Sequence, residues 1–74
     1  MLKRDSTLLS LGLNVRRRRE ALDLTQEALA EKAGLDQTYI SGIERGVRNP
    51  GIKNVVRLAR ALGIPTAKLV EGLD

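Results

Sequence analysis

The chain has 74 residues and contains neither cysteine nor histidine, so disulfides are excluded and the usual transition-metal ligands are missing. A single domain of this small size depends on regular helix packing, on self-association or on both. The formal charge of +4, from 13 basic and 9 acidic residues, favours a polyanionic partner only weakly, because many ordinary domains carry as much charge.

The first expected helix covers residues 7–23, after a loose N-terminal segment over residues 1–6. Apolar residues recur in this helix at spacings of three and four, which is the period of a helix with one buried face. The stripe consists of Leu8, Leu11 or Gly12, Val15, Arg19 and Leu22. It includes a charged residue, Arg19, and a lone buried charge is very costly unless it finds a partner.

Two short helices with clear start and stop signals are expected next. Thr25 suits the N-cap of the second helix, and Gly34 suits its end. Asp36 then caps a third helix, which Gly46 ends. Helices joined by so short a turn cross at a steep angle, so this pair predicts a helix-turn-helix arrangement.

Helices over residues 52–62 and 65–71 complete the expected fold, with Gly63 ending the first of them. The inward stripe of the fourth helix is expected to be Ile52, Val55 or Val56, Ala59 and Leu62. No stretch alternates cleanly with period two, so strands are not expected. The sequence therefore predicts an all-α fold, a compact bundle of five helices in one domain over residues 7–74. No apolar run is long enough to span a bilayer, and no signal peptide is evident.

Glu44 falls on the inward side of the third helix, four residues after Ile40. Arg19 holds the corresponding place on the first helix. The economical interpretation is that Arg19 and Glu44 form an ion pair that joins these two helices. Glu44 is not expected to bind a nucleic acid, because a carboxylate repels phosphate.

A run of four arginines, residues 16–19, suggests nucleic-acid binding, but its geometry weakens that interpretation. Consecutive helical residues lie about 100° apart, so the four side chains do not form one patch. We expect Arg16 to reach a phosphate and Arg17 and Arg18 to be solvated.

The outer face of the third helix carries short polar side chains. The candidate base-reading residues are Gln37, Thr38, Ser41 and Gly42. Glutamine can make a bidentate contact to adenine, threonine can contact a thymine methyl, and serine can bind either kind of edge. Gly42 costs about 1 kcal/mol relative to alanine in a helix interior, which makes sense where something approaches the backbone closely. The alternative is a small, polar, solvated helix face.

Candidate contacts to a nucleic-acid backbone surround this face. The Tyr39 hydroxyl could meet a phosphate, or the ring could pack beside the second helix with its hydroxyl in water. Gln26, in the first turn of the second helix, could meet a phosphate together with the helix N-terminus, or could be simply solvated. Arg45, Arg48 and Asn49 could clamp a DNA backbone, or the arginines could pair with carboxylates.

The segment LTQEALAEKAGLDQTYISGIERGVRNP, residues 24–50, resembles the Cro and phage-repressor (XRE) type of helix-turn-helix domain. The resemblance extends through LARALGI and covers about residues 11–69. The stretch TYISGIER, with the RN that follows, is most similar to the controller proteins of restriction–modification systems. A lambda-repressor-like fold is implied, with the third helix in the major groove of DNA. Base-reading positions are implied for Gln37, Thr38 and Ser41, a phosphate contact for Gln26, and a structural pair for Arg19 and Glu44.

Proteins of this kind usually bind DNA as two-fold dimers. The C-terminal part of the chain carries more apolar residues than one small core needs, and the candidate interface residues are Val56, Leu69, Val70 and Leu73. The alternative is that they cover the base of the domain. We expect a homodimeric, sequence-specific regulator of transcription on a two-fold symmetric operator, in bacterial or phage-infected cytoplasm. RNA polymerase is a further candidate partner.

An enzyme is not expected, and neither is a cofactor. The sequence lacks a glycine-rich phosphate loop and an inward pair of carboxylates, and Ser41 has no base at a plausible spacing. The competing interpretations are a phage-type repressor and a protein-interaction module such as an antitoxin, since the same fold serves those roles.

Overall fold

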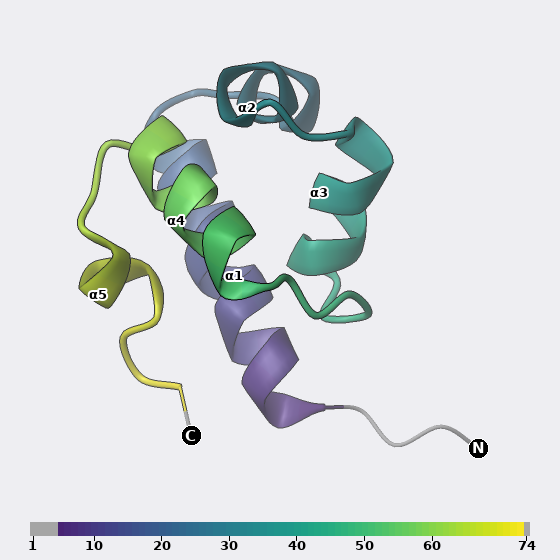
Figure 1. Ribbon diagram of the computed structural model, residues 1–74, viewed down its shortest axis with the longest axis vertical. Helices are drawn as coiled ribbons and strands as arrows, with labels where there is room; N and C mark the ends of the chain where they lie inside the picture. Colours follow the sequence, from purple (N-terminus) through teal and green to yellow (C-terminus); the bar gives the residue numbers. More distant parts are fainter. Residues whose placement is uncertain (1–4, 74) are drawn as a thin grey trace.

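Five helices joined by short loops make up the described part of the chain, residues 5–73 of the computed structural model (Figure 1). They are α1 (Ser6–Ala21), α2 (Gln26–Ala33), α3 (Gln37–Glu44), α4 (Ile52–Ala61) and α5 (Thr66–Leu69). No strand occurs within residues 5–73, and the expected all-α bundle is confirmed. α3 packs against α1 and α2, whereas α5 packs against α4 and α1 on the other side of the bundle. Among the described helices, none is long and apolar enough to cross a membrane.

The start of α1 is fixed by Asp5, whose carboxylate accepts a hydrogen bond from the Leu8 N–H at 3.0 Å. The loose segment expected over residues 1–6 is therefore wrong for residues 5 and 6, and residues 1–4 lie outside the described part. α1 ends at Ala21, before the expected residue 23, and Leu22 is 38% exposed. Leu22 is not part of the inward stripe, because the chain has already left the helix there.

The boundaries of α2 and α3 follow the predicted signals. The Thr25 hydroxyl accepts a hydrogen bond from the α2 backbone at 3.0 Å, and the Asp36 carboxylate accepts one from the α3 backbone at 2.7 Å. Gly34 adopts the left-handed conformation, with φ 68°, which turns the chain from α2 into α3 within a few residues. The predicted helix-turn-helix is present.

The C-terminal part of the bundle is held by two side chains of α1. The Asn14 amide donates to the carbonyls of Leu69 and Glu71, both at 2.9 Å. Arg18 Nε donates to the Leu62 carbonyl at 2.9 Å. The expectation that Arg18 is solvated is wrong, because the last carbonyls of α4 have no donor within their own helix and Arg18 supplies one.

The hydrophobic core lies between the helices and is built from Leu11, Val15, Leu29, Ala30, Ala33, Ile40, Ile43, Val55, Leu58, Ala59, Leu62 and Leu69. Two expectations fail here. Ile52, expected to face inward, is 70% exposed. It is the first residue of α4, and no other described element covers it there. Leu69, expected at a dimer interface, is fully buried beneath α4 and α1 and belongs to the core of the single chain.

α1 and α3 cross so closely at Gly12 that a side chain would not fit between them. A Cβ at this position would lie 2.4 Å from the carbonyl oxygen of Ile43 and 2.6 Å from that of Glu44. Two turns further along α1, the same close crossing brings Arg19 to Glu44.

Candidate nucleic-acid interface

The inner side of α3 is anchored through Glu44, which is only 8% exposed. Arg19 donates to both carboxylate oxygens, from Nε at 2.7 Å and from Nη2 at 2.9 Å. Its Nη1 also donates to the Leu24 carbonyl at 2.8 Å, so one guanidinium joins α1, the loop before α2, and α3. The ion pair expected from the sequence is present, in the bidentate geometry that best compensates two charges removed from water. The hydrogen bond to Glu44 raises the pKa of Arg19 above its usual value, although partial burial acts in the opposite direction.

Gln26 completes this anchor, a role that neither sequence-based interpretation anticipated. Its Nε2 donates to Glu44 Oε1 at 3.1 Å, so the first turn of α2 is tied to the last turn of α3. The first backbone N–H groups of a helix have no partners within the helix and therefore suit an anion. The phosphate contact at this end of α2 stays a prediction. Gln26 would then be a link between that phosphate and the position of α3.

The outer side of α3 carries the side chains predicted to read bases. Gln37 and Thr38 are exposed, Ser41 is half-buried, and Arg45 is exposed beyond the end of the helix. Their spacing places them along one side of α3, opposite Ile40 and Ile43. Because the first three side chains are short, another molecule could approach the α3 backbone closely.

Gly42 does not belong to this exposed set, because it is buried. A Cβ at Gly42 would lie 2.5 Å from Cγ of Arg48. The sequence correctly indicated that something approaches the backbone here, but the neighbour in the folded chain is the Arg48 side chain. We therefore leave Gly42 out of the proposed base-reading set.

Tyr39 lies half-buried between α3 and α4. Its ring packs against the core, and its hydroxyl oxygen accepts a hydrogen bond from the Asn54 amide at 3.2 Å. Asn54 thus positions the hydroxyl from α4, a contact that sequence spacing could not reveal. The phenolic proton is still available for donation to another group.

The remaining backbone candidates are exposed cations and one amide. Arg16 lies 3.5 Å from Glu20 in an exposed pair along α1, an interaction that contributes little and can be exchanged for another. Arg45, Arg48 and Asn49 are exposed at the end of α3 and in the loop to α4. Within the described chain, no carboxylate pairs with either of these two arginines. The structure thus brings these three residues to one end of α3.

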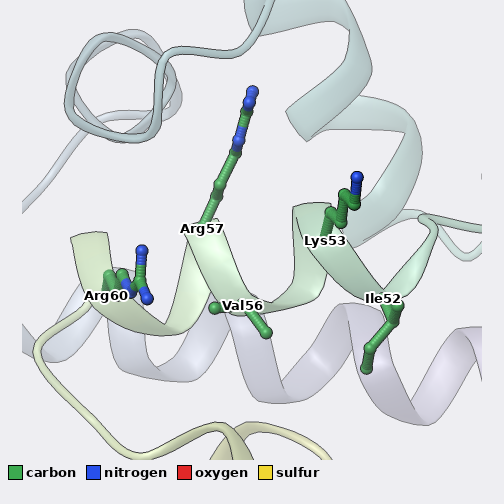
Figure 2. Close-up of a pocket in the computed structure, with 5 residues that line it drawn as sticks. All are labelled: Ile52, Lys53, Val56, Arg57 and Arg60. Atoms are coloured by element: carbon green, nitrogen blue, oxygen red, sulfur yellow. The ribbon is translucent and has the colours of Figure 1, made fainter.

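A second surface of interest, which we call the α4 groove, is an open hollow of about 290 Å³ lined by Ile52, Lys53, Val56, Arg57 and Arg60 (Figure 2). Ile52 is its most exposed apolar residue, and Val56 is half-buried beside it. Lys53 and Arg57 extend to one side of the helix and Ile52 to the other. Val70 and Leu73, the other expected interface residues, are half-buried against the core near α5.

A model of the helix-turn-helix family HTH_3 matches residues 15–69, a range that includes α2 and α3. The chain belongs to this family. One relative is control protein C.SmaI of Serratia marcescens, which is 43% identical to this chain over 60 residues; these span 81% of this chain and 71% of the relative.

Solved structures show the same similarity. The restriction-modification controller protein C.AhdI from Aeromonas hydrophila has a TM-score of 0.83 at 44% identity, with 84% of this chain and 94% of that chain covered. The controller protein C.Esp1396I, solved as a tetramer in complex with its natural 35 base-pair operator, has a TM-score of 0.83 at 36% identity, with 90% and 88% covered. The family and the fold that the sequence suggested are thus confirmed for this HTH_3 chain.

Proposed function

We propose that the protein is a sequence-specific, double-stranded DNA-binding regulator of transcription, of the restriction–modification controller type, which acts as a homodimer on a two-fold symmetric operator. The outer side of α3 carries this proposal. Gln37, Thr38 and Ser41 present short donors and acceptors there, on a helix whose inner side is anchored by charged hydrogen bonds. Similarity to C.SmaI, C.AhdI and operator-bound C.Esp1396I supports the same function.

In the proposed complex α3 lies in the major groove and reads base edges. Gln37 is suited to a bidentate contact with adenine, and Thr38 and Ser41 to thymine methyl groups or polar edges. Contacts to phosphates fix the register of the protein on the duplex but carry no sequence information directly. The proposed backbone set is Gln26, Tyr39, Arg45, Arg48, Asn49 and Arg16. Tyr39 suits this role because Asn54 occupies its oxygen and leaves its proton free.

Two copies are required because one α3 contacts only a few base pairs. The proposed interface is the α4 groove, extended towards α5 by Val70 and Leu73. Ile52 replaces the buried Leu69 as its main apolar contact, because only an exposed side chain can meet a second copy without unfolding the first. The position of the operator relative to a promoter would decide whether RNA polymerase is blocked or recruited.

Selection of binding sites from random duplex DNA tests this function. The best site and a scrambled site would then be titrated at several salt concentrations. We expect a two-fold symmetric motif, with half-sites about one helical turn apart, and much tighter binding to the selected site. If both duplexes bind equally and lose affinity together as salt rises, phosphate attraction alone remains. The protein-interaction alternative would then take precedence.

A further inference from the structure

Gly42 sits in the interior of α3, where glycine is a poor helix former. Its backbone does not require glycine, since its φ is not positive, unlike that of Gly34 or Gly46. The reason for glycine must therefore be sought in what surrounds it. The three atoms nearest to an added Cβ all belong to Arg48: Cγ at 2.5 Å, Cβ at 3.5 Å and Cδ at 3.6 Å. The aliphatic stem of Arg48 thus occupies the space that any other residue at position 42 would fill.

The stem of Arg48 can leave this space only by a change of side-chain rotamer, because its backbone is held in place. The N–H groups of Val47 and Arg48 both donate to the Gly42 carbonyl, at 3.0 Å and 3.2 Å. These bonds hold the Arg48 backbone, and with it Cβ, against α3, so only rotation about the Cα–Cβ bond can move Cγ away from Gly42. A side chain at position 42 would clash with Cγ, at 2.5 Å, but not with Cβ, at 3.5 Å. Relief of that clash requires a rotation that also redirects the guanidinium.

We propose that Gly42 is a positioning residue for Arg48, and that it acts on DNA only through Arg48. The missing side chain at position 42 lets the Arg48 stem lie against α3, which directs the guanidinium to a DNA phosphate at the C-terminal end of the reading helix. The guanidinium has no ion-pair partner among the described residues. The inference rests on the proposed function and assigns to Gly42 a role that differs from direct base contact.

The stem is held over Gly42 before DNA binds. When two residues act as one unit, the free-energy changes of their substitutions are not additive, whereas those of independent residues are. A double-mutant cycle on Gly42 and Arg48 therefore measures the proposed dependence directly.

The cycle compares the unchanged protein, Gly42→Ala, Arg48→Ala and the double variant, by fluorescence-anisotropy titration of the selected duplex at several salt concentrations. Each single substitution should weaken binding about tenfold, as expected for loss of one hydrogen bond to a charged group. Each should also reduce the slope of log affinity against log salt concentration by about one, which corresponds to the loss of one phosphate contact. In the Arg48→Ala background, Gly42→Ala should change affinity less than about twofold. Arg17→Ala, which removes an exposed arginine from a groove between α1 and α5, is the matched control and should leave the affinity near that of the unchanged protein.

Additive losses would overturn the proposal, as would a Gly42→Ala variant that binds like the unchanged protein. Should Gly42→Ala fail to fold, the double variant must recover folding, because it removes the clashing stem; circular dichroism reports this. Failure of the double variant to fold would also count against the proposal.

The DNA-free protein supplies a separate readout. A nuclear Overhauser contact should join the Gly42 α protons to the Arg48 γ-methylene. If this contact is seen but no duplex is bound specifically, the proposed function fails while the packing stands. If specific binding is seen without the contact, the function stands and the positioning role fails.

Discussion

At the scale of single residues, the buried carboxylate of Glu44 is where three segments of the chain meet. It accepts hydrogen bonds from Arg19 of α1 and from Gln26 of α2, while Arg19 also binds the loop before α2. The side chains of Arg19 and Glu44 are 13% and 3% exposed, so each depends on the other for compensation of its charge. Removal of either side chain should therefore leave the other charge buried without a partner, which lowers stability more than the loss of one ordinary contact.

We predict that Glu44→Ala lowers the free energy of unfolding by about 3 kcal/mol, because it leaves the Arg19 guanidinium largely buried without a counter-ion. Urea unfolding followed by circular dichroism measures this. Arg16→Ala is the matched control: it breaks the exposed pair with Glu20 and should change stability by less than about 0.5 kcal/mol. Equal losses for the two variants would mean that burial of the pair does not matter.

At the scale of helices, the position of α3 depends on how closely α1 approaches it. Gly12 allows that approach, because its α-carbon faces carbonyl oxygens of Ile43 and Glu44 with no room between. Backbone oxygens near the end of an anchored helix cannot turn aside as a side chain can. Separation of the two helices would also pull Arg19 away from Glu44.

Gly12→Ala should destabilise the fold by about 2 kcal/mol, in the range found for overpacked contacts, even though alanine is the better helix former by about 1 kcal/mol. Thermal and urea unfolding measure the net effect. Ser10→Ala, in the same helix, gains helix propensity without such a contact and should be neutral or slightly stabilising. A stabilised Gly12→Ala variant would contradict the close crossing of α1 and α3.

The starts of α2 and α3 and the turn between them could be predicted because their signals are local. Thr25 and Asp36 cap helices through atoms two or three residues away, and Gly34 turns the chain by its own conformation. The faces of the helices were harder to predict: Leu22 and Ile52 fit an apolar stripe yet are exposed. Which apolar side chains become covered depends on where the neighbouring elements end.

The candidate site shows the same division. Periodicity alone was enough to pair Arg19 with Glu44, since each was the charged member of an apolar stripe. The link from Gln26 to Glu44, the link from Asn54 to Tyr39 and the contact of Gly42 with Arg48 join segments whose crossing angles no local pattern encodes. The base-reading residues could be proposed in advance because they need only be short, polar and on one side of α3.

At the scale of the whole molecule, the HTH_3 chain presents the outer side of α3 and the α4 groove as separate surfaces. The apolar members of the groove are not needed by the core, since the core is complete without them. Leu69 therefore contributes to the stability of the single folded chain, whereas Ile52 is available for contact with a second copy.

We predict that Ile52→Lys yields a monomer with nearly unchanged stability, because the side chain is 70% exposed in the single chain. Sedimentation velocity measures the oligomeric state, and urea unfolding of dilute samples measures stability. Leu69→Ala is the contrasting variant and should lose about 2–5 kcal/mol through the cavity it creates. A dimer that survives Ile52→Lys unchanged would place the interface elsewhere.

The cations around the α4 groove carry a consequence for assembly. Among the described residues that line the groove with Lys53, Arg57 and Arg60, none is acidic, so two copies that meet there bring like charges together. Dissolved salt weakens this self-repulsion, since exposed charges more than about 10 Å apart are largely screened at 0.1 M, and it also weakens attraction to phosphates. Added salt should therefore raise the affinity of the two copies for each other while it lowers their affinity for DNA. Sedimentation and anisotropy titrations over one salt series should then show opposite trends, with operator occupancy greatest at an intermediate ionic strength.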